Sequence, residues 1–325
     1  MIGDPKRLPH PVEFMGVAIN NLRGLTEKIA KGNKFNLYIG GAIITFTVVL
    51  SSFISGWLIE RLFLIYEVKN PIFSTLIFAF IISSSIASRS LCVSIYEILY
   101  LISKKKYKEN LDDVRQKLSL IVGRDVAELD TNEILRATAE TASENSVDGI
   151  FAPLFWIFIG AIFWKFNDYM PGPLAMAWSF KAASTIDSML GYKEGNLKWL
   201  GFTGAKLDDL MVWIPSRIVL ITLPFCCKAK QSIFETIRNA WKDGIVDSSP
   251  NSGISEAIFA YCAEVRMGGI NYYKGERRIK SIIAETCPVA SVDSVKKILN
   301  ISFRLQLAWL LGFYLIINLI KLLIQ

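Results

Sequence analysis

The chain has 325 residues, of which 52% are hydrophobic and 20% are charged. The apolar residues gather in long runs, which excludes an ordinary soluble enzyme and indicates an all-α polytopic membrane protein. The net charge of +7 is typical of basic cytoplasmic loops, and since no basic stretch alternates with aromatic residues we expect no nucleic-acid partner.

Six segments are candidates for crossing a bilayer, which takes about 20 apolar residues in a helix. Three are clean apolar runs, at 38–59, 71–87 and 303–324. Three are imperfect, at 150–164, 174–190 and 210–227, because they are short or interrupted by charge or proline. Interrupted spans tend to line cavities. We expect about five spans or half-spans in a single integral membrane domain covering 1–325, with 210–227 as a re-entrant piece.

Lys and Arg are concentrated in the segments that connect these runs. By the positive-inside rule, we expect a cytoplasmic N-terminal arm at 1–37 and cytoplasmic helical segments at 88–149 and 228–302. No alternating strand pattern of useful length is present, so no sheet is predicted. The five cysteines lack a C-x-x-C pair, which favours reduced structural thiols.

A helix is predicted to begin near residue 131. Asp130 followed by Glu133 forms a capping-box pattern, and the helix continues through Ala142. Arg136 and Glu140 are spaced for an ion pair at i, i+4. For Glu133 and Glu140 we favour a solvated helix face.

The same helix face carries Glu144, Asn145 and Asp148 immediately before the apolar run at 150–164. An unpaired carboxylate at the threshold of a membrane is costly, so for these three residues we favour a functional site. Oxygen-rich clusters suit Mg²⁺, which takes one or two carboxylates with waters and phosphates.

Two clusters follow within the interrupted runs. Lys181 and Asp187 lie in an apolar segment, where they are either functional or an ion pair that sets helix register. Asp208 and Asp209 precede an apolar stretch. They are either part of a functional site or the ordinary acidic residues of a helix N-terminus. Asp209 and Arg217 fall on one helix stripe unless Pro215 breaks the helix.

The last polar clusters lie between residues 248 and 273. A helix is predicted to open with Asn251, Ser252 and Gly253, and its first N–H groups either hold a phosphate or are capped in the ordinary way. Glu256, one turn into this helix, is either a partner in that site or an ordinary acidic residue of the first turn. Arg266, Asn271 and Tyr272 accompany two glycines. These residues either contact the edge of a nucleotide or belong to a turn that ends the helix.

Near the N-terminus, prolines flank His10 and hold it in extended backbone, as a ligand or a structural residue. Neither a P-loop nor a G-x-G-x-x-G sequence is present in the chain. If the protein uses ATP, it does so without those fingerprints.

Together these segments resemble the CobD/CbiB family, the adenosylcobinamide-phosphate synthases. The resemblance rests on seven motifs in order: GDPKRLPHPVEFMG (3–16), GRD (123–125), SENSVDGIFAPLFW (143–156), STIDSMLGY (184–192), KLDDLMVWIPSR (206–217), SPNSG (249–253) and RMGGINYY (266–273). It covers nearly the whole chain.

The resemblance implies a carbon–nitrogen ligase of cobalamin biosynthesis. Such an enzyme joins adenosylcobyric acid, a corrinoid, to (R)-1-amino-2-propanol or its O-phosphate, with ATP as co-substrate and Mg²⁺ as cofactor. It implies a multi-pass protein of the bacterial or archaeal cytoplasmic membrane, with its site facing the cytoplasm. The oligomeric state, the form of the amine and the nucleotide product are not predicted.

The motif positions suggest roles, which we state as hypotheses. Metal ligands or a base for the amine are expected at Glu144, Asp148, Asp208 and Asp209. Catalytic cations that contact phosphate or corrin carboxamides are expected at Lys181 and Arg217. Substrate-binding residues are expected at His10, Asn145, Asp187, Asn251, Ser252, Gly253, Glu256, Arg266, Asn271 and Tyr272.

Two features depart from the family pattern. Members usually carry an apolar segment before the first motif, which here begins at Gly3, so either that span is lost or the start is misplaced. Ser184 stands where the family usually has Asn. The alternative function is a membrane transporter or sensor whose broken helices bind a small anionic solute; the charged residues in the apolar runs argue against a structural scaffold.

Overall fold

The computed structural model describes residues 11–67, 70–104, 111–228 and 231–324. Their contacts divide the chain into two compact units. Unit 1 consists of 88–151 and 213–311, and unit 2 of the described residues in 2–87, 152–212 and 312–325. Each unit is considered by itself below, and His10 lies outside the described residues.

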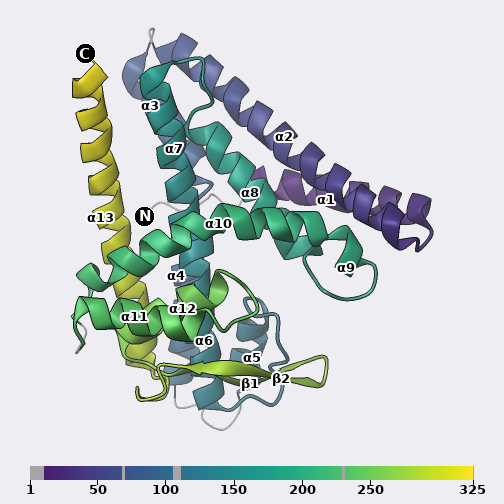
Figure 1. Cartoon of the computed structure of the whole chain (residues 1–325), viewed down its shortest axis with the longest axis vertical. Helices are drawn as coiled ribbons and strands as arrows, with labels where there is room; N and C mark the ends of the chain where they lie inside the picture. Colours follow the sequence, from purple (N-terminus) through teal and green to yellow (C-terminus); the bar gives the residue numbers. More distant parts are fainter. Residues whose placement is uncertain (1–10, 68–69, 105–110, 229–230, 325) are drawn as a thin grey trace. The chain divides into compact units, whose positions relative to one another are not determined.

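The elements are mostly helical (Figure 1). The helices are α1 (Pro11–Ala30), α2 (Lys34–Glu67), α3 (Pro71–Ser83), α4 (Ser88–Ser103), α5 (Asp112–Ser119), α6 (Thr131–Ser146), α7 (Ala152–Phe166), α8 (Pro173–Leu190), α9 (Leu197–Leu200), α10 (Phe202–Thr222), α11 (Ile233–Gly244), α12 (Ser252–Ala263) and α13 (Val292–Ile324). A π-helical turn, η2 (Val147–Phe151), joins α6 to α7, and a 3₁₀ turn, η3 (Leu223–Cys226), follows α10. Two strands, β1 (Met267–Tyr273) and β2 (Glu276–Ile283), complete the fold.

Within the described residues, four helices are long and apolar enough to cross a membrane: 34–66, 131–166, 202–226 and 292–323. The number rises to five if α3 and α4 are taken together as one span. The protein is therefore an all-α polytopic membrane protein, as its composition predicted. The segment 210–227, expected to be a re-entrant piece, lies almost entirely within one of these four helices, and α8 is not among them. Its re-entrant character stays a prediction.

The proline at position 215 does not end α10, which runs through it. The stripe that carries Trp213 and Arg217 is therefore preserved, and the Arg217 guanidinium lies over the Trp213 ring with 4.7 Å to the ring centroid. The cysteines are free thiols, as predicted.

The segment after α12 is a β-hairpin, although no strand was predicted there. β1 pairs with β2 antiparallel, with a bulge between Met267 and Gly269. Gly268 has φ +82°, and a Cβ there would lie 2.0 Å from the Ser281 carbonyl oxygen, so the bulge requires glycine. The alternation is hidden because one strand carries the bulge and most of the other is exposed.

Unit 1 is built around α6, which packs against α4, α12 and β1. Ile98 of α4, Val114 and Leu118 of α5, and Ile134 and Ala137 of α6 form a buried apolar cluster. This cluster holds the first turns of α6 in place, and the buried face of α12 covers its second half. The polar residues of α6 and α12 therefore meet inside the unit.

Unit 2 packs α1, α2 and α8 around a second apolar cluster. Gly56 lets α2 approach α8 closely, since a Cβ there would lie 2.8 Å from the Ala175 Cα atom. One turn further, the buried Glu60 carboxylate accepts hydrogen bonds from the backbone N–H groups of Gly172, Leu174 and Ala175 at 2.6 to 3.0 Å. A charge within a candidate span is thus satisfied by the N-terminus of α8.

Candidate functional site

The polar centre of unit 1 is a buried ion cluster around Glu140. Arg124 donates from Nη2 to Glu140 Oε2 at 2.6 Å, and Arg136 donates to Oε1 at 3.0 Å. The backbone N–H of Gly268 adds a third bond at 2.8 Å. The expectation of a solvated face at Glu140 was therefore wrong, because the hairpin covers this part of α6. The predicted Arg136–Glu140 pair is confirmed.

The start of α6 follows its sequence. Asp130 accepts from the Glu133 backbone N–H, and the Glu133 side chain accepts from the Asp130 N–H, so the predicted capping box is present. The helix passes Ala142 and is followed by the π-helical turn η2, which ends at Phe151, two residues before Pro153. Proline cannot donate to the preceding turn, which favours a widened turn at this point. Asp148 lies on η2, and π-helical turns are frequent at functional sites.

The segment 123–125 fixes the hairpin against this cluster. Arg124 also donates to the side-chain oxygen of Asn271, and Asp125 accepts from the backbone N–H groups of Lys274 and Gly275 at 3.0 and 2.7 Å. The Asp125 N–H donates to the Tyr272 carbonyl oxygen at 2.8 Å. Asn271 therefore has its amide oxygen bound by the protein itself, and the exposed Tyr272 contributes its backbone.

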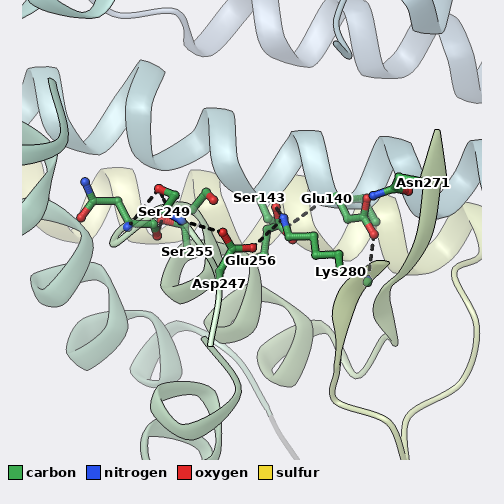
Figure 2. A network of polar contacts seen from close by, with 12 residues as sticks. Glu140, Ser143, Asp247, Ser249, Ser255, Glu256, Asn271 and Lys280 are labelled. Carbon is green, nitrogen blue, oxygen red and sulfur yellow. Dashed lines mark hydrogen bonds and ion pairs between the residues drawn. The ribbon is translucent and has the colours of Figure 1, made fainter. Parts of the chain in front are cut away.

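A second buried pair lies beside the first. Lys280 of β2 donates to Glu256 of α12 at 2.6 Å and lies 3.3 Å from Asp247 (Figure 2). The Glu256 side chain is 1% exposed. Burial raises the pKa of the Glu256 carboxyl to about 8, against the opposing effect of the Lys280 charge. The two carboxylates around Lys280 raise its own pKa in turn, so the lysine stays charged.

These two pairs line one cavity of about 250 Å³, within unit 1. Its charged lining consists of Arg124, Glu140, Glu144, Asp148, Glu256 and Lys280. Asn145, Thr141 and Tyr273 add polar groups. Since carboxylates outnumber cations, the cavity favours a cationic ligand or an anion that brings a metal ion with it.

The loop before α12 lies beside this cavity and is held by Arg217. The guanidinium donates to the Asn251 side-chain oxygen at 2.6 Å and to the Pro250 carbonyl oxygen at 2.7 Å. The N–H groups of Asn251 and Ser252 donate to Ser249 Oγ at 3.3 and 3.2 Å. These backbone groups are thus capped within the chain, and a phosphate role for them stays a prediction.

Gly253 has a packing role that is visible directly. A Cβ at this position would lie 2.4 Å from the Gly244 carbonyl oxygen, so glycine permits the contact between α11 and α12. Arg266, the residue before β1, is exposed and binds through its backbone N–H to the Pro288 carbonyl oxygen at 2.8 Å. Neither observation tests a contact with substrate.

Four predicted residues lie in unit 2: Lys181, Asp187, Asp208 and Asp209. Asp187 and Asp209 are close enough to interact electrostatically, with Lys193 also near Asp187. Asp209 forms an ion pair with Lys206, with 3.3 Å between Oδ2 and Nζ. Their membership of one site with the unit 1 carboxylates stays a prediction.

Glu144 and Asp148 are the expected metal ligands of unit 1. Across the part of the chain that the structure describes, no three His, Cys, Asp or Glu side chains lie close enough to hold a metal ion by themselves. Glu144 and Asp148 both line the cavity, four residues apart on α6 and η2. Mg²⁺ takes one or two carboxylates and fills its other positions with waters and phosphates, so this pair fits Mg²⁺ that arrives with a nucleotide.

The predicted residues that the cavity brings together are Glu144, Asn145, Asp148, Glu256 and Asn271. Three charged residues were missed: Arg124, Glu140 and Lys280. Arg124 belongs to the GRD motif, which was the available signal. Lys280 had none, because it lies in an unpredicted strand between two exposed residues.

The sequence was compared with protein families, curated proteins and solved structures. The family model described as CobD/Cbib protein matches residues 1–302. The cobalamin biosynthesis protein CobD of Synechocystis sp. is 36% identical over 286 residues, which cover 88% of this chain and 79% of the relative. The cobalamin biosynthesis protein CbiB of Salmonella typhimurium is 34% identical over 302 residues, which cover 93% of this chain and 88% of the relative. No solved structure matches significantly.

The family match extends over the polar cavity, the hairpin and the helices that carry them, and the relatives cover both units. This agrees with the seven motifs in order along the sequence. The chain belongs to the CobD/CbiB family.

Proposed function

We propose that this protein acts in cobalamin biosynthesis as an ATP- and Mg²⁺-dependent ligase. It joins the free carboxyl group of adenosylcobyric acid to (R)-1-amino-2-propanol or its O-phosphate, which gives adenosylcobinamide or its phosphate. The two relatives are cobalamin biosynthesis proteins, which supports the pathway. The single structural observation that supports the chemistry is the charged cavity of unit 1.

Amide formation places three demands on such a site. A carboxylate is a poor electrophile, so it must be activated, most simply as an acyl phosphate. The amine must lose a proton before it can attack. Cationic groups must offset the charge of the phosphoryl group during transfer. A cavity that mixes carboxylates with Arg124 and Lys280 contains group types suited to each demand.

We assign Glu144 and Asp148 as the cavity residues that hold Mg²⁺. An ion held there would supply positive charge against the substrate phosphates. Arg124 is fixed by Glu140 and Asn271, so its guanidinium cannot follow a moving ligand. Its role is to present a rigid positive charge at the cavity wall.

The position of the acidic residues along the long helix supports a site at the membrane surface. The helix 131–166 has 36 residues, so it is about 54 Å long, whereas the hydrocarbon core of a bilayer is about 30 Å thick. The polar end that carries Glu140 and Glu144 therefore extends beyond the hydrocarbon. We propose that this end faces the cytoplasm, where corrinoid and ATP are available.

The test is direct. The purified protein in detergent or nanodiscs is given adenosylcobyric acid, Mg-ATP and either aminopropanol or its phosphate, and products are identified by mass. An amide product formed together with ADP or AMP, and only when all three substrates are present, is the expected result. Solute flux in proteoliposomes without corrin-dependent ATP turnover would overturn the proposal and favour a transporter.

A further inference from the structure

Glu256 is a buried carboxyl group with only half of its hydrogen-bonding capacity used. Its Oε1 atom accepts from Lys280 at 2.6 Å. Its Oε2 atom is buried and has no hydrogen-bond partner among the described residues. Buried polar atoms are nearly always bonded, so an exception calls for a reason such as a ligand. Glu256 belongs to the lining of the 250 Å³ cavity.

The chemistry of that lining indicates the sign of the ligand. Glu140 is already neutralised by Arg124 and Arg136. Lys280 is shared between Glu256 and Asp247. Since one lysine serves the two carboxylates of Glu256 and Asp247, this corner attracts a positive group that can donate a hydrogen bond.

We propose that Glu256 binds the ammonium group of the amine co-substrate and removes its proton. This rests on the proposed function and adds to it a catalytic residue and the place of the amine. Lys280 is a positioning residue, because it binds Oε1 of the same carboxyl group and leaves Oε2 available to the amine.

The proton balance is complete with the groups named. The Glu256 carboxylate takes one proton from R–NH₃⁺, which leaves a lone pair on the neutral amine. That pair forms the C–N bond to the activated carboxyl carbon, and the bond from that carbon to the phosphate oxygen breaks. The second proton leaves the new amide nitrogen with the departing phosphate, and Glu256 returns its proton to solvent through the open cavity.

The surroundings of Glu256 tune it for this task. The charged groups that face it are Glu140 and Glu144 from α6, Lys280 from β2 and Asp247 from the loop before α12. On α11, Asp243 is engaged by the Tyr261 hydroxyl and the Ala284 N–H. Burial and the neighbouring carboxylates outweigh Lys280 and raise the pKa of Glu256 to about 8. A base in this range is efficient near neutral pH, since it both ionises and holds a proton once taken.

The test separates the amine step from carboxyl activation by using hydroxylamine, which is a neutral nucleophile near neutral pH and needs no base. The variant Glu256→Gln is assayed with adenosylcobyric acid, Mg-ATP and either aminopropanol or hydroxylamine. We expect amidation of aminopropanol to fall about 100-fold or more, the scale of general-base catalysis. Hydroxamate formation and corrin-dependent ATP turnover with hydroxylamine should stay within about threefold of wild type.

The pH profile gives a second readout. The wild-type rate with aminopropanol should rise with pH and level off above a pKa of about 8. The Glu256→Gln rate should instead keep rising as solvent deprotonates the amine. The conservative variant Glu256→Asp should restore part of the rate and the levelling-off. The matched control is Glu285→Gln, an exposed carboxylate of the same unit, which should behave as wild type.

The outcomes are distinct. If Glu256→Gln amidates aminopropanol at the wild-type rate, or loses the hydroxylamine reaction equally while remaining folded, the assignment of Glu256 is overturned and its role is structural. If the wild-type protein forms neither amide nor hydroxamate, the proposed function itself fails. Should Glu256→Gln not fold, the Glu256→Asp pH profile decides: an unchanged profile and rate contradict the proposal.

Discussion

Arg124 and Glu140 form an ion pair at 2.6 Å whose side chains are only 6% and 7% exposed. The pair joins the loop before α6 to the middle of that helix, and the Glu140 carboxylate also binds the hairpin through Gly268. Arg124 reaches the same hairpin at Asn271. The shape of the cavity wall therefore depends on a charge pair that water scarcely reaches.

Removing one partner of this pair should be costly. We expect Glu140→Gln to destabilise the protein by about 3 to 5 kcal/mol, because it leaves Arg124 and Arg136 without the charge that offsets them. The measurement is the unfolding midpoint in detergent. The exposed pair Lys117–Glu97, with Nζ and Oε2 2.8 Å apart, is the control, and Glu97→Gln should cost less than about 1 kcal/mol. Equal effects of the two changes would contradict the burial argument.

Arg217 should act through the loop that it holds. We expect Arg217→Lys to loosen the segment 247–251, because one ammonium group cannot bind both Asn251 Oδ1 and the Pro250 carbonyl oxygen. Limited proteolysis or hydrogen exchange at this segment should report the change. In a double-mutant cycle with Asn251→Ala, the two losses should overlap by about 0.5 to 3 kcal/mol instead of adding. Additive losses would show that Arg217 acts elsewhere.

The features that could be predicted from the sequence are those decided within a few residues. The Asp130–Glu133 capping box and the Arg136–Glu140 pair are contacts at three and four positions along one helix. The long apolar runs at 38–59 and 303–324 lie in candidate membrane helices, because length and hydropathy decide that property. The run at 71–87 does not qualify by itself, since α3 ends at Ser83 and is a candidate only together with α4.

The features that could not be predicted depend on distant partners. Glu140 looked solvated because its cover, the hairpin strand at Gly268, is 128 residues away in sequence. Lys280 carried no signal in the sequence, and it meets Glu256 from a strand that the sequence did not predict. No local pattern encodes either contact.

In unit 2, Glu60 should be a structural charge. We expect Glu60→Ala to cost about 2 kcal/mol or more, since it leaves the N–H groups of Gly172, Leu174 and Ala175, around the start of α8, without an acceptor. The exposed Asp168, in the loop before α8, gives the control Asp168→Ala, which should be near neutral. Thermal unfolding in detergent compares them, and an equally mild Glu60 variant would refute the capping role.

The carboxylates at the membrane threshold should set the metal requirement. If Glu144 and Asp148 hold Mg²⁺, then Glu144→Gln or Asp148→Asn should raise the Mg²⁺ concentration for half-maximal activity by about tenfold or more, because a hard cation loses a charged oxygen ligand. The exposed Glu128 provides the control Glu128→Gln. A titration of activity against Mg²⁺ at saturating ATP is the measurement. Unchanged Mg²⁺ dependence in both variants would move the metal site away from this cavity.

Glu256 should also make stability depend on pH in a defined direction. Its pKa in the folded protein is raised from the ordinary value of 4.5 to about 8. The folded state therefore binds the proton more tightly, and the stabilising contribution of this group is present below about pH 4.5 and lost as pH rises through about 8. Glutamine does not titrate, so Glu256→Gln should gain stability relative to wild type across this window and then level off. Lys280 stays charged throughout this pH window, since its pKa is raised. The loss of its carboxylate partner in Glu256→Gln therefore changes the stability of the variant by the same amount at every pH. Unfolding midpoints of both proteins at closely spaced pH values measure the difference, and a difference that stays flat between those two pH values would mean that the Glu256 carboxyl group titrates normally.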